Sequence, residues 1–318
     1  MDETERFDAD ADTGADGDAD GAGARALRDI AYRHLDEAAA RRWGALVRPS
    51  VWLASEEESW GARGEPTVAR LGGRPPLSAD VPWPADRDGA PMAFVAAVDC
   101  GAVVRAGGLD LPLPSQGVLA FFASTPFAED GAEGSRAGRC PGRVLHLPAG
   151  TLDTEHPAPP AVPVFPRVPL TACREPSAPF PDHPRVRAAF GLHTAEEFHD
   201  HPLNDQSFVD ELAEYGHRFE NRIGGYPAAS ATAAYEAGAG PAAHPAGGHP
   251  RQPGVEETDG AARWVALAQF QRDPAGGMLV APQPGGTRTA RRGVLLWLIR
   301  PEDLARRAFE EAVLFRAP

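Results

Sequence analysis

The 318-residue chain carries a formal net charge of −14, and 42% of its residues are hydrophobic, values that suit a globular protein. All 31 basic residues are arginine, so the sequence lacks the lysine that P-loop nucleotide binding, protein kinases and pyridoxal-dependent catalysis each require. An acidic chain without a basic stripe is a poor match to nucleic acid.

The N-terminal segment is the most acidic part of the chain. Residues 1–24 contain nine acidic residues and one arginine, in a background of alanine and glycine. Such a segment cannot bury apolar surface, and it predicts a disordered acidic tail. Residues 25–60 follow as an N-terminal helix with a lead-in: apolar residues recur at helical spacing up to residue 44, and a short strand follows at residues 51–53.

Residues 61–190 read as a first β-rich unit with a proline-rich extension. Residues 68–71 are a short stretch of alternating apolar and polar residues, and the apolar runs at 94–98 and 118–123 are typical of buried strands. Further strands are expected at 144–147 and 162–170, and the neighbouring prolines favour edge positions for both.

Residues 191–318 read as a second unit that packs with the first into one compact body. Thr194 and Glu197 form a capping-box pattern at the start of a helix, and a second amphipathic stretch spans residues 208–216. A flexible loop is predicted over 228–262, strands over 264–270 and 293–299, and a helix that starts at Pro301.

The two units share a motif. Residues 70–75 read RLGGRP and residues 222–227 read RIGGYP, and similar apolar strands follow each motif in the same order. We therefore expect an α+β fold built from two similar β-rich repeats with mixed sheets and a few flanking helices, the product of an internal duplication. Paired glycines permit a bend and the proline ends the ladder, although a backbone nest for an anion is an alternative. The residues of this structural motif are Gly72, Gly73, Pro75, Gly224, Gly225 and Pro227.

The motifs together resemble the YwqG-like family of uncharacterised bacterial proteins. The matching stretches include residues 71–75, 81–84, 91–96, 116–122, 223–227, 267–270 and 299–304. The resemblance implies a duplicated fold with mixed sheets, no established activity or cofactor, and antitoxin-like immunity or stress-associated roles. The chain departs from the family pattern at Ala97, where glutamine is usual, and at Gln271, where aspartate is usual.

Three cysteines (Cys100, Cys140 and Cys173) lie far apart without a C-x-x-C motif, which predicts reduced thiols, a cytoplasmic location and no metal site. The N-terminus lacks the apolar segment of a signal peptide, so no targeting sequence is expected. The longest apolar run, residues 294–299, is far short of the ~20 residues that span a bilayer, so no membrane is expected as a partner.

No catalytic constellation emerges, and no cofactor is predicted. His199 and His201 are two residues apart and do not share a helix face. The candidate binding residues are two aromatics beside prolines, a glutamine inside an apolar strand and an acid at a helix start: Trp83, Tyr226, Gln269 and Asp303.

Two hypotheses follow. The leading one is a non-enzymatic binding protein that engages a protein partner through its acidic surface. The alternative is an enzyme or small-ligand-binding protein whose site lies in a groove between the repeats, where the four candidate residues would converge. The oligomeric state stays open.

Overall fold

The computed structural model describes residues 16–55, 65–125, 138–216, 221–227, 263–272 and 293–317. Its strands are β1 (Arg48–Ala54), β2 (Ala69–Leu71), β3 (Ala93–Asp99), β4 (Val118–Ala123), β5 (Gly138–Cys140), β6 (Gly142–Leu147), β7 (Val168–Ser177), β8 (Arg222–Gly224), β9 (Val265–Arg272), β10 (Gly293–Ile299) and β11 (Val313–Ala317). The helices are α1 (Asp16–His34), α2 (Glu37–Gly44), α3 (Cys100–Ala106), α4 (Pro184–Phe190), α5 (Ala195–His199), α6 (Gln206–Gly216) and α9 (Pro301–Ala305), with 3-10 turns η2 (Pro202–Asn204) and η4 (Phe309–Glu311).

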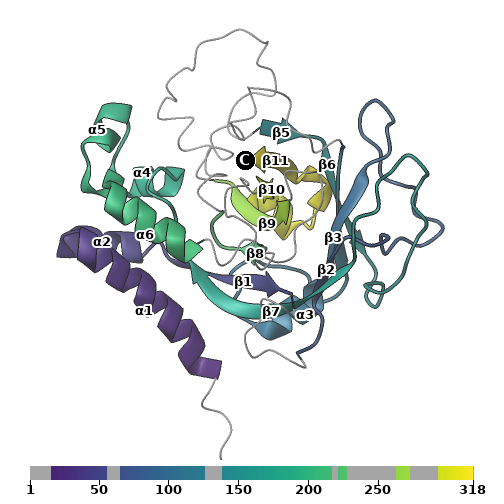
Figure 1. Ribbon diagram of the computed structural model, residues 1–318, viewed down its shortest axis with the longest axis horizontal. Helices are drawn as coiled ribbons and strands as arrows, with labels where there is room; N and C mark the ends of the chain where they lie inside the picture. Colours follow the sequence, from purple (N-terminus) through teal and green to yellow (C-terminus); the bar gives the residue numbers. More distant parts are fainter. Residues whose placement is uncertain are drawn as a thin grey trace, which may run out of the picture.

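All eleven of these strands join one sheet, in the order β5-β11-β10-β9-β8-β1-β7-β2-β3-β4-β6. Every pairing between them is antiparallel. The sheet curls into a nearly closed barrel, and a group of helices lies to one side of it (Figure 1).

The expected fold of two repeats with mixed sheets is therefore wrong. The reason lies in β1 and β7, which pair with each other over seven residues, from Arg48 opposite Ser177 to Ala54 opposite Thr171. On its other side β1 pairs with β8, and β7 pairs with β2, so the two glycine motifs flank the β1–β7 pair in the same sheet. The β1–β7 contacts join residues more than 100 positions apart, and apolar periodicity carries no signal for such pairing.

The position of β7 also corrects an expectation. Its prolines favoured an edge strand that began near residue 162, whereas β7 begins at Val168 and lies between β1 and β2. Residues 168–170 pair only with β2, and residues 171–177 pair only with β1. Pro169 and Pro176 thus each lie in a stretch with a partner on one side, where a missing N–H is tolerated.

One continuous segment brings the two edges of the sheet together. β5 pairs with β11 and β6 pairs with β4, and only Pro141 separates β5 from β6 in the chain. The carbonyl of Pro141 accepts a hydrogen bond from the Ser124 backbone N–H at 3.0 Å. Beside this segment, Phe309 of η4 is buried and contacts the ring of His146 in β6 at 5.5 Å. The chain therefore closes the barrel through a bent strand and a short turn.

The barrel interior is a filled hydrophobic core. Phe121 of β4 meets Phe270 of β9 and Trp297 of β10, with ring centroids 5.1 Å apart in both cases, although β4 is not a sheet neighbour of either strand. All three rings are fully buried. Apolar residues on alternating positions of the surrounding strands complete this cluster, so side chains and not a channel fill the barrel.

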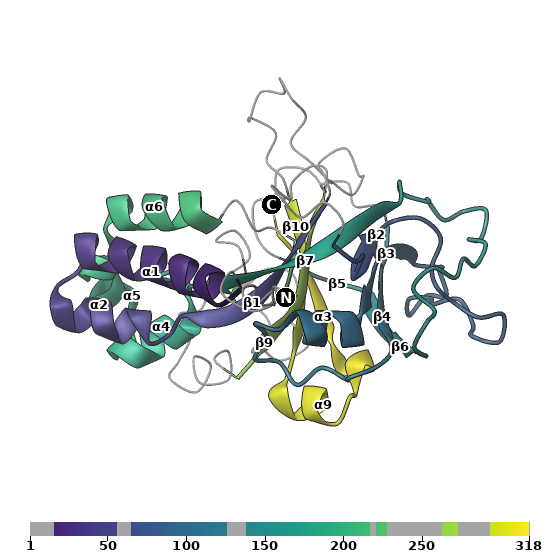
Figure 2. The same ribbon diagram turned by 90° about the horizontal axis from the view of Figure 1, so that it is seen from below.

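Five helices form a separate lobe beside the barrel. Figure 2 shows α1, α2, α4, α5 and α6 gathered to one side of the barrel, beside the ends of β1 and β7. Their core centres on Trp43 and Phe208, whose rings pack edge to face at 5.4 Å. The helix expected over 25–44 is in fact two helices, since Asp36 caps α2 by accepting the Ala39 N–H at 2.8 Å. We call these five helices the helical lobe.

The other local expectations have mixed outcomes. The capping box of Thr194 and Glu197 is present in α5, and β3, β4, β9 and β10 lie within a few residues of their predicted positions. The predicted helix at Pro301 is only five residues long. The predicted loop 228–262 and residues 1–15 of the predicted tail lie outside the described residues. In the described parts of the chain, no helix combines the length and the apolar character of a membrane span.

Candidate functional site

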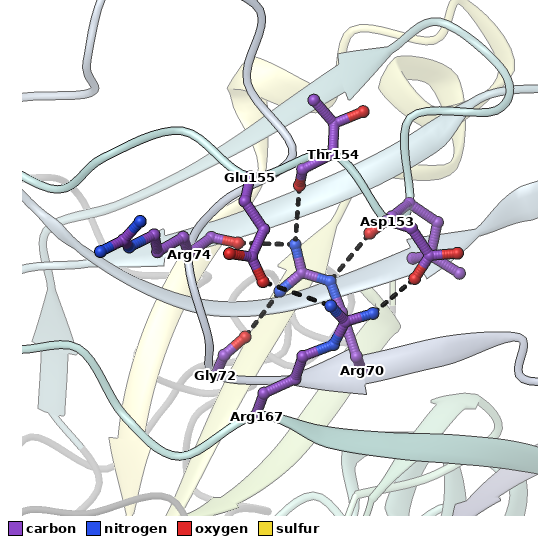
Figure 3. A network of polar contacts seen from close by, with 8 residues as sticks. Arg70, Gly72, Arg74, Asp153, Thr154, Glu155 and Arg167 are labelled. Atoms are coloured by element: carbon purple, nitrogen blue, oxygen red, sulfur yellow. Dashed lines mark hydrogen bonds and ion pairs between the residues drawn. The ribbon is translucent and has the colours of Figure 1, made fainter.

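Arg70, the first residue of the first glycine motif, is fully buried on the outer side of the barrel wall. Its side chain donates to four backbone carbonyls (Figure 3): Leu152 at 2.8 Å, Gly72 at 2.7 Å, Arg74 at 2.6 Å and Thr154 at 3.4 Å. These carbonyls belong to two loops, one directly after β2 and one after β6. A single guanidinium thus ties both loops to the sheet.

The surroundings of Arg70 explain how a buried cation is tolerated here. Its guanidinium lies 5.0 Å from the centroid of the Phe94 ring, a cation–π arrangement. Burial and the nearby charge of Arg167 lower the pKa of Arg70 to about 10, and Glu155 and Asp153 oppose this shift. Arg167 itself pairs with both of these carboxylates at the surface. The four hydrogen bonds thus commit the Nε, Nη1 and Nη2 atoms of Arg70 to backbone carbonyls.

The glycine pairs make the bends that bring these carbonyls to the arginines. Gly72 and Gly73 have φ of +53° and +73°, and Gly224 and Gly225 have φ of +71° and +68°. All four residues lie in the left-handed region that glycine alone adopts at low cost. A Cβ on Gly72 would lie 2.1 Å from the Pro166 carbonyl oxygen, so close backbone approach also requires glycine there.

Arg222 occupies the corresponding position in the second motif. It is buried, and its Nη1 donates to the Tyr226 carbonyl at 2.7 Å, four residues along, as Arg70 does to Arg74. Arg222 lies opposite Gln269 in β9, just as Arg70 lies opposite Ala97 in β3. The sequence singled out the glycines of the two motifs, but the shared chemistry of the two sites is the arginine that precedes them. The identical residue at the first position of both motifs was the available signal.

Tyr226, a predicted binding residue, is 2% exposed and joins the sheet to the helical lobe. Its hydroxyl donates to the Leu46 carbonyl at 2.8 Å, and its backbone N–H donates to Ser177 Oγ at 2.9 Å. The ring packs edge to face on the His183 ring, with centroids 4.9 Å apart. These contacts all lie in the interior of the protein.

Gln269 is fully buried on β9, within a group of buried polar residues that includes Asn221, Arg222 and Gln271. Asn221 Oδ1 accepts the backbone N–H of Gln271 at 2.9 Å. The side-chain Nε2 of Gln271 is buried and has no hydrogen-bond partner among the described residues. These buried polar residues therefore continue from Arg222 in β8 to the neighbouring strand β9.

Trp83 and Asp303, the remaining predicted residues, lie elsewhere. Trp83 Nε1 donates to the Met92 carbonyl at 2.9 Å, and its ring packs edge to face on Phe122 with centroids 6.0 Å apart. Asp303 lies in α9 and pairs with Arg306 at 2.5 Å. No contact among the described residues joins either side chain to Tyr226 or Gln269. The structure therefore brings two of the four predicted residues to Arg222 and leaves the other two apart.

Metal-ligating residues do not gather in the described ranges, where no group of three or more histidine, cysteine or acidic side chains is placed to hold an ion. His199 and His201 flank a helix end instead, and His201 caps η2 by accepting the Leu203 N–H at 3.1 Å.

The surface of α5 and α6 carries a charge pattern that the net charge of the whole chain conceals. Residues 188–216 contain seven acidic residues and no arginine. Six of these seven are exposed, and we call them the acidic face: Glu196, Glu197, Asp200, Asp205, Asp210 and Glu214. The seventh, Glu211, contacts Arg33 and His34 of α1. The signal was available in the sequence, but it emerges only when charge is counted along this segment.

Comparison with known proteins identifies the barrel. Residues 69–316 match the model of a domain of unknown function, DUF1963. The match starts at the first residue of β2 and ends inside β11, so it covers ten of the eleven described strands and leaves out α1, α2 and β1. No curated protein matches the chain. Because the match covers well over half of the sequence, this chain belongs to the DUF1963 family of domains of unknown function.

Proposed function

We propose that this chain is a non-enzymatic binding protein that engages a protein partner with a basic surface through the acidic face of α5 and α6. The observation that carries the proposal is the exposure of six carboxylates within residues 196–214, a stretch of the helical lobe that contains no arginine. A role in immunity or stress response, in the cytoplasm of a bacterium, is the finer part of the proposal and follows from the resemblance to YwqG-like proteins.

Electrostatics support this face as a contact surface. Asp210 and Glu214 lie four residues apart on α6, and like charges at this spacing repel one another and weaken a helix slightly. Asp205 and Glu197 have local roles, since Asp205 accepts the Ser207 N–H at 3.0 Å and Glu197 accepts the Thr194 N–H at 2.9 Å. Glu196, Asp200 and Glu214 make no such contacts with the described residues. A basic partner would relieve this repulsion and would be steered towards the face at low salt.

The lobe offers a firm support for this face. Phe208 and Leu212 of α6 are buried against α1 and α2, opposite the exposed acids. Glu211 ties α6 to α1 through Arg33 and through His34, whose Nε2 lies 2.7 Å from its carboxylate. The exposed carboxylates therefore project from helices whose other side is held in a core.

To test the proposal, we choose three acids whose carboxylates accept no hydrogen bond from a backbone N–H among the described residues, and we replace each with its neutral amide. A Glu196→Gln, Asp210→Asn, Glu214→Gln variant is used as bait in the native host, beside the wild-type chain and a matched control with Glu302→Gln, Glu310→Gln and Glu311→Gln. The control acids are exposed on α9 and η4, on the barrel. Both variants change the net charge by the same amount.

We expect a basic protein to be recovered in stoichiometric amount with the wild type and the control, and to be reduced at least about tenfold with the lobe variant, at low salt. Binding that also weakens with salt supports a charged interface. Equal recovery with both variants, or no stoichiometric protein at all, would rule the proposal out.

A further inference from the structure

The tripeptide Asp-His-Pro occurs twice in the lobe, at residues 182–184 and at 200–202. In both copies the histidine is the N-cap of a helical segment and the proline is its first residue: His183 precedes α4, and His201 precedes η2. The backbone conformations are alike, with φ −62° and ψ 136° at His183 and φ −81° and ψ 140° at His201. The same three residues thus start two segments of one lobe in the same way.

The two histidines cap through the same atom. His183 Nδ1 accepts the Arg185 backbone N–H at 3.1 Å, and His201 Nδ1 accepts the Leu203 backbone N–H at 3.1 Å. Because proline has no N–H, the first unpaired donor of each segment is on the next residue, where the ring nitrogen meets it. A ring nitrogen accepts a hydrogen bond only when it carries no proton, so each cap requires a neutral imidazole.

The groups around His183 oppose its protonation. It is 1% exposed and packs on the Tyr226 ring. Two cations act on its pKa: Arg185, on its own helix, and Arg48, from β1, whose guanidinium lies 5.9 Å from the centroid of that tyrosine ring. Asp182 is its acidic neighbour in the chain. Burial, with these two cations, lowers the pKa of His183 to about 3.

His201 has a milder setting. Its ring packs edge to face on Phe190 of α4, with centroids 5.4 Å apart, and it is partly exposed. Asp36, the N-cap of α2, is the charged group that faces it, and Asp200 is its neighbour in the chain. Burial lowers the pKa of His201, and the charge of Asp36 opposes that shift. The His201 cap therefore lies where α2, α4 and η2 meet, whereas the His183 cap lies at the start of α4 against Tyr226.

We propose that the two Asp-His-Pro caps form a pH-sensitive switch, in which protonation of His183 and His201 releases the starts of α4 and η2 and opens the helical lobe while the barrel stays folded. The inference concerns the lobe itself and does not depend on the proposed partner.

The direction of the effect follows from proton linkage. A histidine that is released titrates near pH 6.5, whereas His183 in the closed lobe resists protonation until about pH 3. The equilibrium between closed and open lobe is therefore unaffected above about pH 7. Opening becomes more favourable as the pH falls from about 6.5 towards about 3. At pH 5 the open fraction is expected to rise about 30-fold from His183 alone, relative to neutral pH, with a smaller added effect from His201.

Hydrogen exchange with mass spectrometry on the full chain, corrected for intrinsic pH dependence, tests the switch. Peptides from α4 and α6 should lose protection by tens of fold between pH 7 and 5, whereas peptides from β4 and β10 should keep theirs. A His183→Asn, His201→Asn variant replaces each acceptor nitrogen with an amide oxygen that does not titrate. This variant should retain lobe protection down to pH 5. His199→Asn, an exposed lobe histidine that caps nothing through its side chain, is the control and should behave as wild type.

Two results would overturn the proposal: the same pH-dependent loss in the double variant and the wild type, or a loss of protection in the lobe and the barrel together. If the double variant does not fold, His201→Asn alone decides the matter, because its partly exposed position tolerates the change. That single variant should lose a measurable part of the pH response of α6, and an unchanged response would contradict the switch.

Discussion

The hydroxyl of Tyr226 donates a hydrogen bond to the carbonyl of Leu46 at 2.8 Å, across 180 residues of sequence. Leu46 follows α2 in the helical lobe, and Tyr226 follows β8 in the barrel wall. The same tyrosine ring contacts His183, the cap of α4. One buried side chain thus joins the second glycine motif to two helices of the lobe.

Replacing Tyr226 with phenylalanine should destabilise the protein by about 1–2 kcal/mol, because the Leu46 carbonyl is left buried without its donor. Urea unfolding followed by circular dichroism measures this change. Tyr32→Phe is the control, since Tyr32 is 47% exposed, and it should cost less than about 0.5 kcal/mol. Equal effects in the two variants would show that the Leu46 hydrogen bond contributes little.

Arg70→Met should be far more costly than a change at the neighbouring Arg74. The methionine fills much of the volume but leaves four backbone carbonyls without their donor, and a loss of about 3 kcal/mol or more is expected. Arg74 is exposed and contributes its carbonyl to the network, so Arg74→Ala should stay within about 0.5 kcal/mol of wild type. Thermal melts and urea midpoints of both variants make the comparison. Similar stabilities would contradict the structural role of the guanidinium.

Two glycines separate backbone strain from steric clash. Gly89 has φ of +81° and open space where a Cβ would lie, so Gly89→Ala should cost about 1 kcal/mol from strain alone. Gly72 has φ of +53°, and its Cβ would meet the Pro166 carbonyl at 2.1 Å, so Gly72→Ala should cost about 3 kcal/mol or more. Denaturant unfolding of the two alanine variants gives the difference. A Gly72→Ala variant no less stable than Gly89→Ala would mean that the backbone of residues 165–166 moves away from the added Cβ at little cost in free energy.

Cys100 should resist alkylation in the native protein. It is fully buried at the start of α3, and burial together with the charge of Asp99 raises the pKa of its thiol to about 12. At pH 8 its thiolate fraction is expected to be lower than that of a free thiol by about a thousandfold. Iodoacetamide labelling with mass spectrometry should modify Cys100 only after the protein is denatured. Rapid labelling of the native chain would show that α3 opens readily.

Some elements follow directly from local sequence. The apolar runs that became β3, β4 and β10 are buried on both faces, so continuous hydrophobicity identifies them without tertiary information. The capping box of α5 is equally local, because its two hydrogen bonds join Thr194 and Glu197, which are three residues apart. β7 was placed poorly for the opposite reason: its central position depends on β1 and β2, which come much earlier in the chain.

The candidate site divides in the same way. Tyr226 and Gln269 are notable in sequence for their residue type, but only the fold places both against Arg222 and buries them, and it leaves Trp83 and Asp303 in other packing environments. Residue type and spacing show which hydrogen bonds and packing contacts a side chain is able to make. They do not show which other parts of the chain bury it.

The sequence by itself determined the segments of β3, β4, β9 and β10, the glycine bends and the absence of lysine chemistry, because each depends on residue type or on neighbours within a few positions. The tertiary structure alone decided that both glycine motifs share one antiparallel sheet and that Arg70 and Arg222 are buried in its wall. The physical reason is that strand pairing and burial are set by contacts between residues far apart in the chain, whose free energy appears only when the whole barrel has formed.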